Sequence, residues 1–191
     1  TKLKNMVFNI SIKPPVSPVS PELLQPIIFT DITLIDNLVL KTSSEIVLSE
    51  NVNIVGSQTL SQRLHNSISD SDIQQSLLFL EETGYVKIIS KDYLGSIKYI
   101  TVDNATFLKF LSYEIKDFNS ISKKCLILIA SEGVGLSNTK IASHFEIPKI
   151  AASEILNSLQ NSGEVRLSAK MDGTLVILGV SKSFERRMQN T

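Results

Sequence analysis

The stretch LEETGYVKI (residues 80–88) predicts the end of one helix and the beginning of a strand. Polar residues follow the first leucine, Gly84 favours a helix stop because glycine readily adopts a left-handed backbone, and strand-forming residues come next. A similar stretch, LQNSGEVRL (residues 159–167), occurs later in the chain. A chain that ends a helix and starts a strand twice in the same way indicates a duplicated plan.

The two stretches align residue by residue. The matched pairs are Leu80 with Leu159, Gly84 with Gly163, Val86 with Val165, Lys87 with Arg166 and Ile88 with Leu167. The preceding helices align only after a shift of two residues, which pairs Leu60 with Ile141 and Leu64 with Phe145. The turns therefore differ in length, and the repeat is one of architecture rather than of close sequence.

Helical stripes precede both stretches. In SQTLSQRLHNSI (residues 57–68), leucine and isoleucine recur at four-residue spacing, and Ser69 or Ser71 is a suitable cap for the helix that follows, up to residue 83. Three helices are predicted before the second copy, at residues 122–133, 138–147 and 148–162, the last beginning at a proline. In each copy, the helix that precedes the strands is therefore predicted to end at a glycine, Gly84 or Gly163.

Each helix stop is followed by two strands. The segments YVKIIS (residues 85–90) and IKYITV (residues 97–102) form one predicted hairpin, and residues 165–167 and 174–178 form another. The expected turn residues are Gly95 in the first hairpin and the pair Asp172-Gly173 in the second.

The N-terminal part of the chain has sequence patterns that differ from those of the two copies. The alternation in MVFNISI (residues 6–12) predicts a short strand, and residues 13–26 carry five of the six prolines, which favours an extended connector. DITLIDNLVLK (residues 31–41) predicts a helix capped by Asp31. Two segments just after it are expected to be extended, EIVL (residues 45–48) and VNIV (residues 52–55).

Between the copies, Asp103 caps a predicted connecting helix, NATFLKFLSYEIKDF. The order of helices and hairpins, occurring twice, resembles the tandem winged-helix (winged helix-turn-helix) superfamily over about residues 31–179. The resemblance implies an α+β fold: two winged helix-turn-helix units in tandem joined by a connecting helix, with an N-terminal strand and proline-rich extension. The expected divisions are the strand and connector at 1–29, a first winged-helix domain at 30–102, the connecting helix at 103–119, a second domain at 120–180 and a basic tail at 181–191.

Composition restricts the function classes only partly. The 191 residues include 19 basic and 19 acidic side chains, so no global charge attracts nucleic acid or membrane, although a local basic strip is compatible with a neutral total. A single cysteine favours a reducing, intracellular location, cytoplasmic or nuclear. No apolar run approaches a membrane helix, so no membrane partner is expected. The start at Thr1 rather than Met leaves open that the chain is part of a longer protein.

In DNA-binding members of that superfamily, the third helix of each unit enters the major groove. The first such helix here, residues 69–83, is acidic at its start and offers only Gln74 and Gln75 for base edges, so it is a poor reader. The second unit is the better candidate. The predicted nucleic-acid-binding residues are Lys149, Ser153 and Asn157 on its third helix, Lys87, Lys91, Lys98, Arg166 and Lys170 on the wings, and Arg186 and Arg187 in the tail.

We therefore predict a module that binds double-stranded DNA in transcription regulation or chromosome maintenance, on fold-level analogy. Scattered lysines on exposed strands are also ordinary solubilising charge. The alternative is a protein-interaction adaptor, a role that winged-helix pairs take in chromosome-condensation and RNA polymerase accessory subunits. The acidic first recognition helix fits this role, as does an N-terminal strand able to extend a partner's sheet. The oligomeric state stays open, a homodimer included.

No enzyme emerges from the sequence. His65 and His144 fall in separate repeats without metal-ligand spacing, so no metal site is predicted. Cys125 lies in the apolar stretch KKCLILIA, where a buried, inert thiol is expected. No phosphate loop or acid–base pair of carboxylates is present, and no cofactor is expected.

Overall fold

The computed structural model describes residues 28–189 of the chain. Over that range the protein is α+β, with eight helices and two small antiparallel sheets. The strand predicted at residues 6–12 and the proline-rich connector lie outside the described residues. None of the helices between residues 28 and 189 is both long enough and apolar enough to cross a membrane.

The first helix, α1, is Leu34–Glu50, and its bounds differ from those predicted. Thr33 is the N-cap in place of Asp31: its hydroxyl accepts a hydrogen bond from the backbone N–H of Asp36, whose carboxylate accepts one from the backbone N–H of Thr33. The prediction that residues 45–48 are extended was wrong, because α1 continues through them. Their β-branched side chains are buried in the core, and this packing outweighs their weak helix propensity.

A short strand and two helices follow. Strand β1 is Val55–Gly56, α2 is Ser57–Leu64 and α3 is Asp70–Glu82. The side chain of Ser69 caps α3 by accepting a hydrogen bond from the backbone N–H of Asp72 at 3.2 Å. On α2 the predicted stripe faces the core through Leu60 and Leu64. On α3 Ile73, Leu77 and Leu80 are buried, but Leu78, which the sequence predicts on the same buried face, is 47% exposed. Of the residues predicted at 52–55 only the last forms a strand.

The first hairpin consists of β2, Val86–Lys91, and β3, Ile97–Val102. Strand β3 lies in the middle of a three-stranded sheet in the order β1-β3-β2, with both neighbours antiparallel to it. The register places Val86 opposite Val102, with an irregularity after Ile88. The hairpin predicted at this place in the sequence is confirmed.

The connecting helix predicted at residues 103–119 ends earlier than expected, and the helix predicted at residues 122–133 begins earlier. Helix α4 is Asn104–Glu114, capped by Asp103 as expected, and α5 is Phe118–Glu132. Between them Ile115 leaves the helix in an extended conformation and Asp117 adopts a left-handed one, so the chain turns. The apolar spacing continues across the turn because the first residue of α5 is also buried, so the sequence placed the boundary between the two helices too late.

The remaining elements repeat the order of the first part. They are α6, Asn138–Phe145, α7, Lys149–Asn161, and the antiparallel pair β4, Val165–Ala169, and β5, Leu175–Val180. Pro148 is the N-cap of α7. We call residues 28–102 the N-terminal half and residues 118–189 the C-terminal half.

The expected basic tail is a helix, α8, Lys182–Gln189. Phe184 is its one fully buried side chain, and α8 packs against α5. The charged residues of SKSFERRMQNT concealed this helix, because only one large aromatic residue marks its apolar face.

Gly84 and Gly163 occupy equivalent places in the two halves. Their φ angles are 80° and 72°, and nothing lies within 4 Å of the position that a Cβ would take, so backbone conformation alone selects glycine. In both copies the residue after the glycine donates its N–H to a leucine carbonyl in the last turn of the helix. These bonds are Tyr85 to Leu80 and Glu164 to Leu159, each 2.8 Å long. The predicted common geometry of the two stretches is confirmed.

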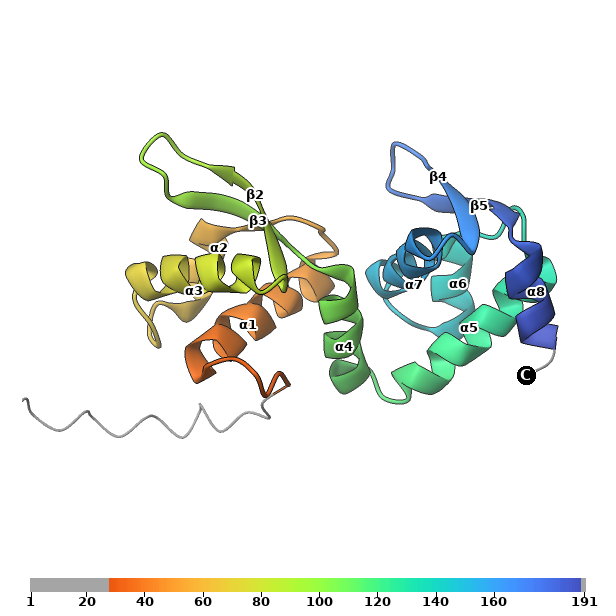
Figure 1. Cartoon of the computed structure of the whole chain (residues 1–191), viewed down its shortest axis with the longest axis horizontal. Coiled ribbons are helices and arrows are strands. Elements are labelled where there is room, and N and C mark those ends of the chain that lie inside the picture. Colours follow the sequence, from red (N-terminus) through yellow and green to blue (C-terminus); the bar gives the residue numbers. More distant parts are fainter. Residues whose placement is uncertain (1–27, 190–191) are drawn as a thin grey trace, which may run out of the picture.

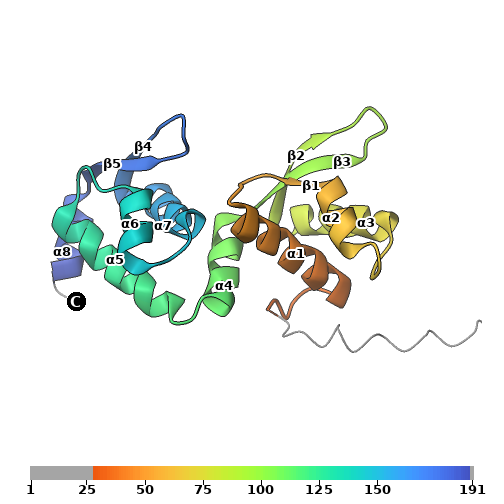
Figure 2. The same ribbon diagram turned by 180° about the vertical axis from the view of Figure 1, so that it is seen from behind.

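The two halves lie side by side with α4 between them (Figure 1). Helix α4 packs against α1, α5 and α7, and buried residues of both halves belong to one hydrophobic core. The β2–β3 and β4–β5 hairpins project toward the same edge of the molecule, as the two opposite views in Figures 1 and 2 show. A surface that includes both hairpins therefore contains residues of both halves.

Candidate functional site

The five basic residues predicted on the wings are exposed on the two hairpins. They are Lys87, Lys91 and Lys98 on β2–β3, and Arg166 and Lys170 on β4–β5. Both hairpins project toward one edge of the molecule (Figure 1). Lys91, Lys98 and Lys170 lie near the hairpin turns, whereas Lys87 and Arg166 lie at the starts of β2 and β4. Such an arrangement offers two sets of cations to an extended anionic partner.

The hairpin turns also carry negative charge. The Asp92 carboxylate accepts two backbone N–H bonds of its own turn at 2.9 Å, and Asp172 accepts one from Thr174 at the same distance. Hydrogen bonds from Thr174 hold the pKa of Asp172 below its ordinary value, and nearby Lys149 and Lys170 act in the same direction. The positive potential of each hairpin is thus reduced at its turn.

Two of the residues predicted to read bases on α7 do not lie on an open face. Ser153 is only 8% exposed; its hydroxyl accepts a hydrogen bond from Asn138 Nδ2 at 2.8 Å and donates one to the Lys149 carbonyl at 2.9 Å. Asn157 is partly buried, and its amide donates to Glu154 at 3.2 Å. The hydroxyl of Ser153 is therefore used inside the protein, and its contact with bases stays a prediction.

Lys149 is directed toward the β4–β5 turn. Its Nζ donates to the carbonyl of Asp172 at 3.3 Å and to Thr174 Oγ1 at 3.4 Å. The start of α7 is therefore tied to the hairpin.

Helix α7 as a whole is enclosed on most sides, because it packs against α6 and β4 within its own half and against α4 and α1 beyond it. Of its residues only the last two, Gln160 and Asn161, are exposed. A helix that reads the major groove must present a row of side chains to base edges. The enclosure of α7 removes the basis for preferring the second unit as the DNA reader.

Helix α3 has an open face, and that face is acidic and apolar. Leu78 and Phe79 are 47% and 38% exposed, and Asp70, Asp72 and Glu82 are exposed on the same helix. Gln74, one of the two residues considered for base contact, is bonded to the hairpin instead. Its amide oxygen accepts from the Ile97 N–H at 2.7 Å, and its Nε2 donates to the Ile97 carbonyl at 3.3 Å.

Large apolar side chains also mark the turns of both hairpins. Tyr93 and Leu94 are 94% and 76% exposed at the β2–β3 turn, and Met171 is fully exposed at the β4–β5 turn. Aromatic residues and methionine are enriched in protein interfaces, whereas scattered surface leucines alone carry no such meaning. Exposed apolar side chains at the turn are therefore a second feature, besides the basic residues, that the two hairpins share.

The remaining predicted cations lie near the base of the second hairpin. The Arg166 guanidinium covers Gly179, with Nη2 only 3.2 Å from the place of a Cβ on that glycine. Arg187 on α8 is exposed, forms an ion pair with Glu164 and lies over the Phe184 ring at 5.4 Å. Arg186 is exposed on the same helix. Arg187 therefore joins α8 to the start of β4.

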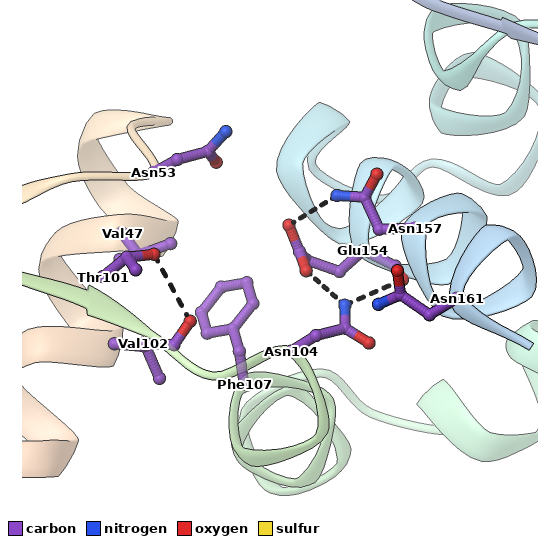
Figure 3. Close-up of a pocket in the computed structure, with 9 residues that line it drawn as sticks. All are labelled: Val47, Asn53, Thr101, Val102, Asn104, Phe107, Glu154, Asn157 and Asn161. Atoms are coloured by element: carbon purple, nitrogen blue, oxygen red, sulfur yellow. Dashed lines mark hydrogen bonds between the residues drawn. The ribbon is translucent and has the colours of Figure 1, made fainter. Parts of the chain in front are cut away.

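A cavity of about 320 Å³ lies between the two halves (Figure 3). No sequence pattern predicted this cavity. Its walls come from α1, β3, α4, α7 and the loop after α1. The lining residues are Val47, Asn53, Thr101, Val102, Asn104, Phe107, Glu154, Asn157 and Asn161. Four asparagines and one carboxylate thus face a space that also has an apolar wall.

Glu154 is the only charged residue that lines this cavity. Asn104 Nδ2 donates both to the Glu154 carboxylate and to the Glu154 carbonyl, the latter at 3.1 Å, so α4 is hydrogen-bonded to α7. Burial raises the pKa of Glu154, against the opposing effect of the hydrogen bonds from Asn104 and Asn157. The sequence showed Glu154 only as a lone acid on a helix, and no local signal showed that α4 would face it.

The described residues hold no group of three or more His, Cys, Asp or Glu that could bind a metal ion. Cys125 is buried on α5, and desolvation raises its pKa to about 12. A thiol held in its neutral form is a poor nucleophile.

No protein-family model matches the chain, and no curated protein matches it either, so the residues and their geometry alone carry the functional argument.

Proposed function

We propose that the two halves are winged helix-turn-helix units and that the chain is a protein-interaction adaptor built on them. The order of elements supports the fold: α1, α2 and α3 precede the β2–β3 hairpin, and α5, α6 and α7 precede the β4–β5 hairpin. The equivalent backbone bonds after Gly84 and Gly163 support a duplicated plan.

The exposed face of α3 is the observation that supports an adaptor function. In a winged-helix unit this helix is the one that meets a ligand. Here it presents Leu78 and Phe79, with Glu82 one turn later and Asp72 two turns earlier on the same face. Phosphate repels such a surface, whereas a protein partner with an apolar centre and basic rim complements it. Because α7 is enclosed, the equivalent helix of the C-terminal half offers no comparable face.

Affinity purification from the cells that produce the chain tests the proposal with three baits. They are the wild type, a variant with Leu78→Ser and Phe79→Ser, and a control with Lys87→Ala, Lys91→Ala and Lys98→Ala. We expect a partner to be retained in stoichiometric amount by the wild type and the lysine control and to be lost from the α3 variant. Equal retention by all three baits, or loss only from the lysine control, contradicts the proposal.

Contact with double-stranded DNA is the second candidate function. The observation that favours it is the pair of basic hairpins directed toward one edge, which suits backbone contact without base readout. Fluorescence anisotropy with a short duplex tests it. DNA contact predicts a log–log salt slope of about −0.9 per phosphate and weaker binding when Arg166 and Lys170 become alanine. No binding at about 10 µM protein in low salt contradicts it.

A further inference from the structure

We propose that the cavity between the two halves binds a small organic cation with an ammonium or guanidinium head. This site is separate from α3 and the hairpin turns, and it goes beyond the adaptor function. The inference begins with the charge of the cavity: among residues 28–189, Glu154 is its one ionisable lining residue, and no lysine or arginine of that range lines it.

Both carboxylate oxygens of Glu154 have neutral partners. One accepts from the amide of Asn104 and the other from that of Asn157. Because the Asn104 nitrogen faces two oxygen acceptors, the orientation of this amide follows from its surroundings. A carboxylate partly withdrawn from water with only neutral donors is left without a counter-charge, and a bound cation would supply one through a charge-assisted hydrogen bond.

Further hydrogen-bond acceptors line the cavity around Glu154. In Figure 3, Asn53 and Thr101 lie on the opposite wall, while Asn157 and Asn161 extend from α7. The side-chain amides of Asn53 and Asn161 form no hydrogen bond within residues 28–189, so their oxygens are free to accept from a ligand. An ammonium or guanidinium head has three or more donors and can use several such acceptors together.

The other wall favours an organic rather than a metal cation. Val47, Val102 and the ring of Phe107 line it, and they suit a short hydrocarbon chain next to the charged head. Metal ions such as Ca²⁺ and Mg²⁺ need several oxygen ligands, but two of the amides already direct N–H groups at the only carboxylate. A volume of about 320 Å³ limits the ligand to a small molecule.

Isothermal titration calorimetry with three probes of similar shape tests the proposal: n-butylguanidinium, n-butylammonium and the neutral n-butylurea, at constant ionic strength. We expect a Kd for the better cation of about 1 mM or less and binding of the urea weaker by about tenfold or more. Glu154→Gln should remove this preference, and the control Glu82→Gln on α3 should keep it.

Equal binding of cation and urea, an unchanged affinity in Glu154→Gln, or no heat of binding at about 10 mM cation overturns the proposal. Asn161→Leu provides an independent test if Glu154→Gln does not fold. This change fills part of the cavity from the exposed end of α7 and leaves the Asn104–Glu154 bonds intact, so it should weaken cation binding; unchanged binding counts against the site. Neither outcome depends on the α3 surface, so this test and that of the adaptor function fail separately.

Discussion

At the scale of single residues, the two glycines after α3 and α7 have one role. A side chain at Gly84 or Gly163 would meet no other atom within 4 Å, so the need for glycine comes from the positive φ angle and not from crowding. For L-residues the left-handed conformation costs about 1–2 kcal/mol, least for asparagine and aspartate. A turn with this conformation directs the chain from each helix into its hairpin.

Gly163→Ala should therefore lower the free energy of unfolding by about 1 kcal/mol. Urea denaturation measures this change, and Gly163→Asn is the matched control, because asparagine tolerates a left-handed backbone and should cost less. If alanine is tolerated as well as asparagine, the strain argument fails at this position.

Glu154 gives a pH-dependent prediction at the same scale. Desolvation raises its pKa above the ordinary value of 4.5, so the folded state binds this proton more tightly than the unfolded state. Its contribution to stability is then present below the unfolded pKa and is lost as pH rises through the folded one. Glutamine does not titrate, so the stability of Glu154→Gln relative to the wild type should rise as the pH increases from the ordinary pKa of 4.5 through the higher folded pKa. Denaturation curves at several pH values measure the difference, and a constant difference would refute the assignment.

At the scale of secondary structure, local signals predicted elements where the sequence carries its own stop and period. The glycine stops, the Ser69 and Asp103 caps and the hairpins all follow this rule. The extension of α1 through residues 45–48 could not be predicted, because burial in the core decides it. The boundary between α4 and α5 was predicted too late in the chain, because apolar spacing continues across the turn.

Helix α8 depends on one anchor. Phe184 is its only fully buried residue, so Phe184→Ala should lower the free energy of unfolding by about 3 kcal/mol and speed amide hydrogen exchange in α8. Arg187→Ala is the control, since an ion pair whose arginine is exposed to solvent contributes about 1 kcal/mol or less. Equal effects of the two substitutions would show that packing of Phe184 does not hold α8 in place.

At the scale of the whole molecule, α4 joins the halves. It contacts α1 and α7, and the amide of Asn104 bonds to Glu154 across the boundary. The sequence could predict the two repeats but not this contact, because no local pattern states which faces of two repeats meet. For the same reason the enclosure of α7 and the cavity beside it were not predicted, although the hairpin cations were placed correctly by their strands.

Asn104→Leu should therefore weaken the junction more than Asn157→Leu does. The first change removes the donor of two bonds to Glu154, whereas Asn157 contributes one, and a hydrogen bond to a charged group contributes about 1.5–3 kcal/mol when buried, less where water reaches it. Calorimetry should show one unfolding transition for the wild type and a broadened or divided one for Asn104→Leu. A single sharp transition in that variant would mean that the core alone couples the halves.

The common direction of the two hairpins has a consequence for partner choice. With α4 packed between the halves, the separation of the hairpins is a fixed property of the folded chain. A partner whose two contact points match that separation gains the second contact intramolecularly, at a high effective concentration. A partner with another spacing would gain only one contact, so a partner that bridges both hairpins, as proposed, would be selected by distance as well as by chemistry.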